Sequence, residues 1–526
     1  MYLSRNPLCA QHGCAVTSHP IASSIGVDIL KQGGNAIDAA IAMAAVLTVV
    51  EPTSNGLGSD AYAIVAYQNE LYGLNGSGKS PALLTKENVV KKHGNIDKMP
   101  RYGWTPVTIP GAVKAWVDLH ERFGKLSFEQ VLQPAIDLAQ DGFVVEDEIG
   151  KNWHNAVSRY QQIKDDDFSE FFKTFTKDGM APKPRTLFNL PNHAKTLKAI
   201  AKTKGTSFYE GEIAEKIEQS SLQHGGFLRK SDLMAHRSEW VKPVSIKYRD
   251  YDVYELPPNG HGIVALMGLN ILNQFEYEGK NEKDYHQCFE AMKLAFASGK
   301  HHITDLEHMK VSVNSLLSEE YAKTMKESIN DTAQEPIVHH PYQGGTVYLC
   351  AADQEGNMIS YIQSNYTGFG SGIVVEDTGI ALQNRGLDFS LDENAVNFLQ
   401  PHKRSYHTII PGFLGKGKRL IGPFGVMGGY MQPQGHLQVI RNMVDANMNP
   451  QEALDEARWQ WIEGKKFIVE KHFDKELMEA LRARGHIVEV EENHSRFGRG
   501  QMILRLENDL YLIGCESRCD ANIALY

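Results

Sequence analysis

A pair of glycines followed by a threonine that opens a β-rich run, Gly344-Gly345-Thr346, constrains this chain more than any other feature. Upstream, Asp331–Tyr342 has no hydrophobic period and contains two prolines, which predicts an exposed linker. Downstream, residues 346–352 form a short apolar run of strand-forming residues, and residues 357–364 return as a second strand after a turn. The pattern therefore predicts a seam at 331–345 that leads directly into a central strand.

Thr346 is, in this setting, a candidate N-terminal nucleophile. Its hydroxyl would first attack the carbonyl of Gly345, where a glycine tolerates the strained backbone that the attack requires. Cleavage would free an α-amine with a pKa of about 7.7–8, which suits a general base near neutral pH. The triplet alone has a simpler interpretation, a strand that enters from a glycine turn, so other parts of the chain must decide.

Charge and hydropathy exclude several classes of function. The 526 residues carry a formal net charge of −10 without a long Lys/Arg run, which argues against nucleic acid as the partner. The N-terminus has no apolar segment typical of a secretory signal. The longest apolar stretch, 39–50, is too short and too rich in alanine to cross a bilayer. We therefore expect a cytoplasmic protein that does not enter a membrane.

Cysteine and histidine spacing gives no sign of a metal site. None of the six cysteines forms a Cys-x-x-Cys pair, and reduced thiols are expected, although Cys515 and Cys519 are close in sequence. The 21 histidines include no His-Glu-x-x-His motif. We expect neither a metal nor an organic cofactor.

Helix and strand patterns occur in blocks along the chain. The N-terminal half is rich in helix patterns, among them 21–32, 36–50, 111–123, 127–140, 262–274 and 282–298, with a hairpin at 61–67 and 70–74. From Thr346 onward, strands are predicted at 346–352, 357–364, 372–382, 419–426, 486–491, 501–506 and 509–514, with helices at 434–446, 450–460 and 475–483. Strand-rich cores flanked by helices indicate a layered α/β architecture.

Gly73–Ser80 matches G-x-x-x-x-G-K-[ST] after a predicted strand, which is typical of a phosphate-binding loop. Pro81 follows at once and removes an amide N–H from the turn that would hold phosphate. No apolar strand ends in the acidic residue that would help to hold magnesium. A glycine-rich turn is the competing interpretation.

Longer segments resemble the γ-glutamyltransferase (glutathione hydrolase) family of N-terminal nucleophile hydrolases, from about Ala15 to the C-terminus. The similar segments are HPIASSIGVDILKQGGNAIDAAIAMAAVLTVVEPTSNGLGSDAY near the start, VTIPGAVKAW at 107–116, YHQCFEAMKLAFA at 285–297, the run that begins GGTVYLCAADQEGN at 344–390, and GVMGGYMQPQGH at 425–436. Thr346 precedes Asp353 and Asn357 at the spacing of the family's processing threonine. This resemblance also accounts for Gly73–Ser80 without a nucleotide.

The resemblance implies a four-layer αββα sandwich. It also implies a precursor that cuts itself between Gly345 and Thr346 into a large subunit, 1–345, and a small subunit, 346–526, which remain together as one intertwined domain. Thr346 would then attack the γ-amide of a small-molecule glutamyl donor to give an acyl-enzyme, which water or an amine acceptor releases.

Further site residues follow from the same resemblance. Backbone amides of Gly428 and Gly429 would form the oxyanion hole, although a plain strand-to-helix turn is the alternative. Ser364 occupies the position of a family threonine that supports the nucleophile; the alternative is a strand residue that bonds a neighbour. Asp388 matches the aspartate that holds the donor α-amino group, unless it is a solvated turn residue.

The chain also departs from the family pattern. The arginine that grips the donor α-carboxylate in the family falls at about Ser77, so we expect Arg404 or Arg385 to replace it, with Lys79 as a nearby point charge. This pattern is more similar to the branch of the family that overlaps with cephalosporin (glutaryl) acylases than to the archetypal γ-glutamyltransferase.

Four hypotheses remain after this reading. The first is a self-cleaving hydrolase or transferase of glutathione or other γ-glutamyl amides. The second keeps the mechanism but takes a glutaryl-type acyl group. The third is an unprocessed relative that binds γ-glutamyl metabolites, and the fourth is a nucleotide binder that uses Gly73–Ser80.

Overall fold

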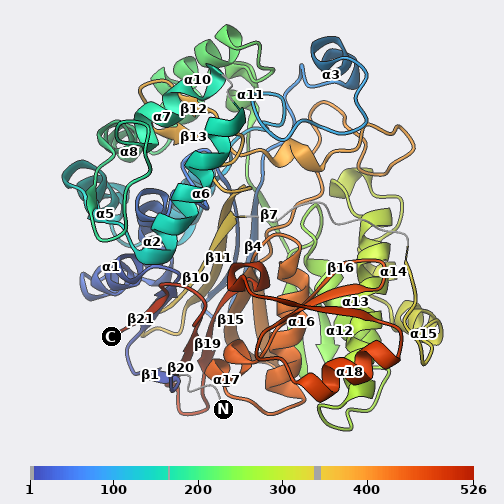
Figure 1. Cartoon of the computed structure of the whole chain (residues 1–526). Coiled ribbons are helices and arrows are strands. Elements are labelled where there is room, and N and C mark those ends of the chain that lie inside the picture. The colour runs from blue at the N-terminus through green and yellow to red at the C-terminus, as the bar shows by residue number, and fades with distance from the viewer. Residues whose placement is uncertain (1–4, 164–165, 337–344) are drawn as a thin grey trace.

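Two antiparallel sheets of seven strands lie face to face, and helices cover the outer face of each (Figure 1). The structure, a computed structural model, describes residues 5–163, 166–336 and 345–526. Gly344 and the rest of 337–344 lie outside the described residues. The arrangement is the four-layer αββα sandwich that the family resemblance implies, and it agrees with the layered α/β architecture that the sequence patterns predict.

The first sheet has the order β21-β2-β10-β11-β3-β4-β7 and contains the candidate nucleophile. Its strands are β2 (Cys14–Thr17), β3 (Asp60–Tyr67), β4 (Glu70–Gly76), β7 (Glu239–Val241), β10 (Gly345–Ala352), β11 (Met358–Tyr366) and β21 (Asn522–Leu525).

The second sheet has the order β1-β20-β19-β15-β14-β9-β8. Its strands are β1 (Leu8–Ala10), β8 (Val244–Tyr248), β9 (Tyr251–Glu255), β14 (Gly412–Lys416), β15 (Arg419–Met427), β19 (Arg499–Arg505) and β20 (Tyr511–Cys515). The shorter strands are β5 (Phe143–Val144), β6 (Leu187–Phe188), β12 (Val374–Val375), β13 (Ile380–Ala381), β16 (Trp459–Glu463), β17 (Lys466–Glu470) and β18 (Ile487–Glu491).

The main strands are apolar on both faces because each sheet is buried on both sides. Along β10, Val347 and Leu349 point into the core beneath the helices of the first layer. Tyr348 and Cys350 alternate with them and point into the core between the sheets. A third core lies between the second sheet and its helices. Three cores separate four layers, as the architecture requires.

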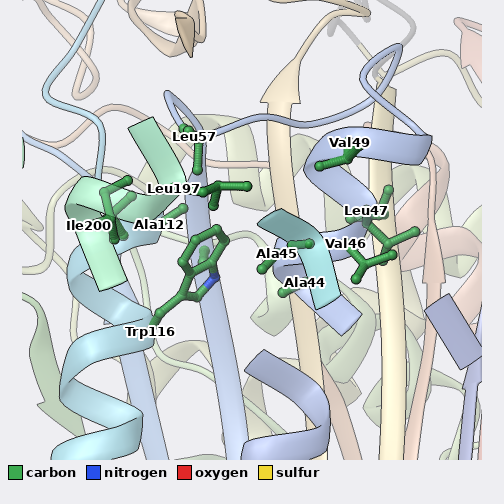
Figure 2. Close-up of a cluster of buried hydrophobic side chains, with 14 of the residues drawn as sticks. Ala44, Ala45, Val46, Leu47, Val49, Leu57, Ala112, Trp116, Leu197 and Ile200 are labelled. Carbon is green, nitrogen blue, oxygen red and sulfur yellow. The ribbon is translucent and has the colours of Figure 1, made fainter. Parts of the chain in front are cut away.

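Helix α2 (Ala36–Val50) is buried along its whole length at the centre of the first helical layer. Asn35 caps it, and Asp38 completes a capping box by accepting from the Asn35 amide. Figure 2 shows its C-terminal half beside Trp116 of α4 (Ala112–Phe123) in a cluster of apolar side chains. Most of its side chains are small or branched apolar groups, as expected of a helix that is covered on all sides.

The remaining helices lie on the outer faces of the sandwich (Figure 1). They are α1 (Pro20–Lys31), α3 (Lys86–His93), α5 (Phe128–Asp141), α6 (Asp147–Ile163), α7 (Ser169–Phe175), α8 (Pro191–Thr203), α9 (Thr206–Tyr209), α10 (Glu212–Gln223), α11 (Lys230–Ala235), α12 (Gly262–Leu272), α13 (Glu282–His302), α14 (Val313–Leu316), α15 (Glu319–Glu327), α16 (Met431–Val444), α17 (Pro450–Asp455) and α18 (Lys475–Ala483).

Two predicted elements are wrong. The predicted strand at 372–382 is instead the short hairpin of β12 and β13, because turn residues interrupt the apolar run. The predicted helix at 450–460 ends as α17 at Asp455, and β16 begins at Trp459. The alternation of buried tryptophans around Gln460 is typical of a strand and outweighs the helical start.

The linker is also less exposed than predicted where the structure describes it. Ala333 is buried, and its amide donates to the carbonyl of Arg484 at 2.8 Å. Gln334 contacts α13 through the carboxylate of Glu290 and the ammonium of Lys293. Residues 331–334 are therefore held against the second helical layer.

All six cysteines are free. Among the described residues, no helix combines the length and hydropathy that a bilayer span requires.

Candidate active site

Thr346 lies near the start of β10, in the middle of the first sheet, and is 1 % exposed. The register of β10 against β11 shifts at this point, since Gly345 pairs with Tyr366 and Val347 pairs with Gln363. Two residues of β11, Ser364 and its neighbour, therefore lie opposite one residue of β10. Such irregularities interrupt the ladder and redirect a side chain.

The hydroxyl of Ser364 joins the nucleophile to the bond that would be cut. Thr346 Oγ1 donates to Ser364 Oγ at 3.1 Å, and Ser364 Oγ donates to the carbonyl oxygen of Gly345 at 2.7 Å. The amide of Tyr366 donates to the same hydroxyl at 2.8 Å. Ser364 is thus oriented by three contacts and polarises the carbonyl that Thr346 would attack.

Gly345 is required by close packing and not by backbone strain. It belongs to the extended strand and is absent from the residues with positive φ. A β-carbon there would lie 2.9 Å from the amide nitrogen of Gly368 and 3.2 Å from the carbonyl oxygen of Thr53. The strain predicted at Gly345 occurs instead at its strand partner Tyr366, whose φ is +76°.

Gly428 and Gly429 form the turn between β15 and α16. Their φ values of +137° and +60° favour glycine, and their carbonyls accept from the first amides of α16. Within the described part of the chain, neither glycine amide donates to another backbone group. Two unused amides at the N-terminal end of a helix are suited to an oxyanion.

Asp388 connects this turn to the strand of the nucleophile. Its Oδ1 accepts from Tyr366 at 2.8 Å and from Tyr430, the residue after Gly429, at 3.2 Å. The side chain is 4 % exposed, and burial raises its pKa. Asp388 is therefore a buried, fixed carboxylate and not a solvated turn residue.

The two candidate arginines have different surroundings. Arg404 is already engaged, because it donates to the carbonyl of Ser77 at 3.1 Å and to Glu239 at 2.6 Å. Arg385 stacks on Tyr366 with 4.0 Å to the ring centroid and donates to Thr408 at 2.8 Å. Its Nε and Nη2 have no hydrogen-bond partner among the described residues. Arg385 retains the donors that a carboxylate needs.

Lys300 is a residue of the site that sequence reasoning missed. It extends from α13, lies 4.1 and 4.2 Å from the ring centroids of Tyr406 and Tyr430, and donates to the Tyr430 hydroxyl. Burial lowers its pKa to about 8, and the charge of Asp388 opposes that shift. Lys300, Asp388 and Tyr406 line one cavity of about 530 Å³ with His302 and Lys310.

A second buried pair lies beside Ser364. Asp60 is the strand partner of Ser364 in β3, and His407 Nε2 lies 3.0 Å from its Oδ2. Burial raises the pKa of Asp60 to about 7, against the effect of Arg385. Nothing in the sequence links positions 60 and 407, so only the fold identifies this pair.

Gly73–Ser80 does not form a phosphate cradle. No helix begins at this loop, since α3 starts only at Lys86. The amide of Gly78 donates to Asp60 at 3.1 Å, and that of Ser80 donates to the carbonyl of Lys403. A β-carbon at Gly78 would lie 1.6 Å from the carbonyl oxygen of Ile109. The amides that would bind phosphate are used within the fold, so the nucleotide-binding hypothesis is wrong.

One group of potential metal ligands occurs among the described residues, and it consists of His286, Glu290 and His486. These three residues lie on α13 and just before β18, and none of them forms a hydrogen bond with Thr346, Ser364 or Asp388. The site around Thr346 is built from hydroxyls, amides and fixed charges, and this set suits acyl transfer.

A family model described as Gamma-glutamyltranspeptidase matches residues 22–526. The Glutathione hydrolase-like YwrD proenzyme of Bacillus subtilis (strain 168) is 36% identical over 514 residues, which cover 95% of this chain and 95% of that protein. The Oxamate amidohydrolase proenzyme of Klebsiella pneumoniae subsp. pneumoniae is 31% identical over 528 residues, with 98% of each covered.

A solved structure is also highly similar. The crystal structure of cephalosporin acylase from Bacillus halodurans superposes with a TM-score of 0.97 at 49% identity, and covers 100% of this chain and 98% of that one. Similarity in sequence and similarity in fold to these proteins both extend over nearly the whole chain.

Proposed function

This chain belongs to the gamma-glutamyltranspeptidase family and is a hydrolase of that family, and on this premise we propose that it cleaves itself before Thr346 and then hydrolyses amides through that threonine. The observation that carries the proposal is the line of contacts from Thr346 Oγ1 through Ser364 Oγ to the Gly345 carbonyl. Two relatives named as proenzymes support the same conclusion.

In the self-cleavage step, Thr346 Oγ1 attacks the carbonyl carbon of Gly345. The proton of the Thr346 hydroxyl passes to the departing amide nitrogen, and the Gly345–Thr346 C–N bond breaks. The Ser364 hydroxyl lies next to this transfer, because Thr346 Oγ1 donates to it. Ser364 stabilises the developing oxyanion because it already donates to that oxygen. Water then hydrolyses the ester and releases a C-terminal carboxylate at Gly345 and a free α-amine on Thr346.

In the turnover step, that α-amine takes the proton from Thr346 Oγ1 as the hydroxyl attacks the donor amide. The amides of Gly428 and Gly429 stabilise the oxyanion, the leaving amine takes a proton, and an ester to Thr346 remains. Water or an amine acceptor then releases the acyl group. No metal or organic cofactor is assigned to either step.

The acyl group is a carboxylate-bearing chain, as in γ-glutamyl amides such as glutathione. Arg385 supports this proposal, since its unpaired guanidinium nitrogens are buried next to Asp388. It takes the carboxylate-binding role that the family gives to an arginine at about position 77. Arg404 is assigned to holding the loop at Ser77.

One observation favours a second acyl group, of glutaryl type, that lacks the α-amino group. A γ-glutamyl donor must place an ammonium on Asp388, but Lys300 and Arg385 already neutralise that carboxylate. Lys300 is held at the Tyr430 hydroxyl, which itself donates to Asp388. With two cations and one anion, the pocket attracts an anion more than a zwitterion.

Denaturing electrophoresis of the purified protein tests the proposed mechanism. The wild type is expected to give two bands for 1–345 and 346–526, and Thr346→Ala is expected to give one inactive band. A single wild-type band without amidase activity would support the unprocessed binding relative instead.

Matched γ-glutamyl and glutaryl anilides test the donor. The charge arrangement predicts a higher kcat/KM for the glutaryl compound. Lys300→Met should shift the ratio towards the γ-glutamyl compound, because the ammonium of that donor no longer meets a second cation. A wild-type preference for the γ-glutamyl compound that Lys300→Met does not change would contradict this assignment.

A further inference from the structure

Two histidines and a glutamate from distant parts of the chain meet in the second helical layer, outside the site described above. His286 and Glu290 lie one turn apart on the same face of α13. His486 lies between α18 and β18, and all three side chains are buried. Their nearest nitrogen and oxygen atoms all lie within 4.8 Å of one another.

We infer that His286, Glu290 and His486 bind a divalent transition-metal ion of the zinc type. His286 Nδ1 lies 2.8 Å from His486 Nε2, and His486 Nε2 lies 3.8 Å from Glu290 Oε1. In a tetrahedral zinc site, ligand atoms lie about 2.1 Å from the ion and therefore about 3.4 Å from one another. Side-chain shifts of about half an ångström would bring these two separations to that value.

The protonation pattern leaves two lone pairs for the ion. His286 Nε2 lies 2.7 Å from the carbonyl oxygen of Asn330, so this nitrogen carries the hydrogen and Nδ1 has a lone pair. His486 binds through Nε2 once its hydrogen moves to Nδ1, and no proton has to leave the protein. The Asn330 carbonyl orients His286, as partners of metal-bound histidines commonly do.

His486 has no second anchor. Its Nδ1 has no hydrogen-bond partner among the described residues, and its side chain is fully buried. No existing hydrogen bond at Nδ1 therefore opposes the tautomer that presents a lone pair at Nε2. The Nδ1 hydrogen would stay without a partner, which costs part of the binding free energy.

Lys293 is the group that opposes the ion. Its ammonium lies 2.6 Å from Glu290 Oε1 and donates to the carbonyl of Gln334 at 2.6 Å. Lys293 therefore competes with the ion for Glu290 Oε1, the same oxygen that lies 3.8 Å from His486 Nε2.

The position gives the ion a structural role. His286 and Glu290 belong to 1–345, and His486 belongs to 346–526, so the ion would join the two products of the proposed cleavage. Residues 330–334, at the start of the 331–345 seam, cover the group through Asn330 and Gln334. Only this bridging role rests on the proposed function, since binding of the ion itself requires no cleavage.

Zinc titration of the EDTA-treated full chain, with a chromophoric chelator as competitor, tests the inference. We expect one zinc ion per chain, and four-coordinate visible absorption when cobalt(II) replaces zinc. His286→Gln and His486→Gln should each weaken binding by more than the tenfold to hundredfold that loss of an outer-shell partner costs, roughly a hundredfold or more. His308→Gln, which alters an exposed histidine, should leave the affinity unchanged.

Lys293→Met provides a test that does not depend on losing a ligand. Removal of the competing cation should strengthen zinc binding by about tenfold or more. Failure of both the wild type and Lys293→Met to bind zinc stoichiometrically would overturn the inference, and so would binding that His286→Gln and His486→Gln leave intact. The same titration on Thr346→Ala separates the zinc site from the proposed self-cleavage. The uncut chain keeps all three ligands, so it should bind zinc as tightly as the wild type.

Discussion

At the scale of single residues, the hydroxyl of Ser364 ties the geometry most directly to the proposed self-cleavage. It accepts from Thr346 and donates to the Gly345 carbonyl. Ser364→Ala removes both contacts, so cleavage should slow by about a hundredfold or more, as for loss of one oxyanion donor. The fraction of cut chain against time after expression or refolding measures this rate.

Ser360→Ala is the matched control, because Ser360 lies on the same strand but contacts Tyr348 between the sheets. It should leave cleavage at the wild-type rate. Equal cleavage rates in Ser364→Ala and Ser360→Ala would remove Ser364 from the mechanism.

Lys300 gives the site a predicted pH dependence. Burial lowers its pKa to about 8, so it loses its charge as the pH rises through that value. KM for an anionic donor should therefore rise between about pH 7 and pH 9 in the wild type. Lys300→Arg stays charged over this range and should flatten the rise.

The same shift has a stability consequence with a definite sign. Between about pH 8 and pH 10.5 the unfolded chain binds a proton at Lys300 that the folded chain does not bind, so this group makes the free energy of unfolding rise with pH. A KM that is independent of pH in the wild type would contradict the assigned role of Lys300.

The Gly-Gly-Thr pattern before a predicted strand made Thr346 a candidate, and the resemblance to the family added Ser364 and Asp388. Lys300 and the Asp60–His407 pair escaped sequence reasoning for a physical reason. Their partners are far away along the chain, and only the packing of α13 and the pairing of β3 with β11 bring them to the site.

At the scale of elements, the turn from β15 into α16 carries the predicted oxyanion hole. Gly428 has a φ of +137°, a conformation that residues with a β-carbon rarely adopt. Gly428→Ala should therefore displace the two amides and lower both cleavage and turnover by about a hundredfold. Rates of cleavage and of anilide hydrolysis check this prediction.

Gly417→Ala is the control for backbone strain alone. Gly417 lies in the hairpin between β14 and β15 with a φ of +63°, and nothing surrounds its missing β-carbon within 4 Å. Its substitution should cost about 1 kcal/mol of stability and leave activity unchanged. Comparable losses of activity in both variants would mean that the amides of Gly428 and Gly429 have no special role.

Elements with strong local signals were predicted well, and those set by tertiary context were not. Helix α2 has the predicted bounds because Asn35 caps it and Pro52 prevents its continuation. The segment after Pro450 begins as a helix but joins β17 as strand β16 from Trp459. Pairing with a neighbouring strand there outweighs local helix propensity.

At the scale of the whole molecule, the proposed cut would leave two pieces that share both sheets. In the first sheet, β10 lies between β2 of the large piece and β11 of the small piece. In the second sheet, β14 of the small piece pairs with β9 of the large piece. Each piece alone would expose long unpaired strand edges.

The cut protein should therefore elute as one species of full-length size in native size-exclusion chromatography and separate only in denaturant. Pieces 1–345 and 346–526 expressed apart should be insoluble or unfolded. Independent folding of either piece would contradict the intertwined arrangement.

The N-terminal sequence of the small fragment of the active wild-type protein tests the central claim most directly. The account predicts a fragment that begins Thr-Val-Tyr-Leu, with Thr346 as its first residue. An active protein whose chain is continuous between Gly345 and Thr346 would contradict it, and so would a fragment that begins at any other residue.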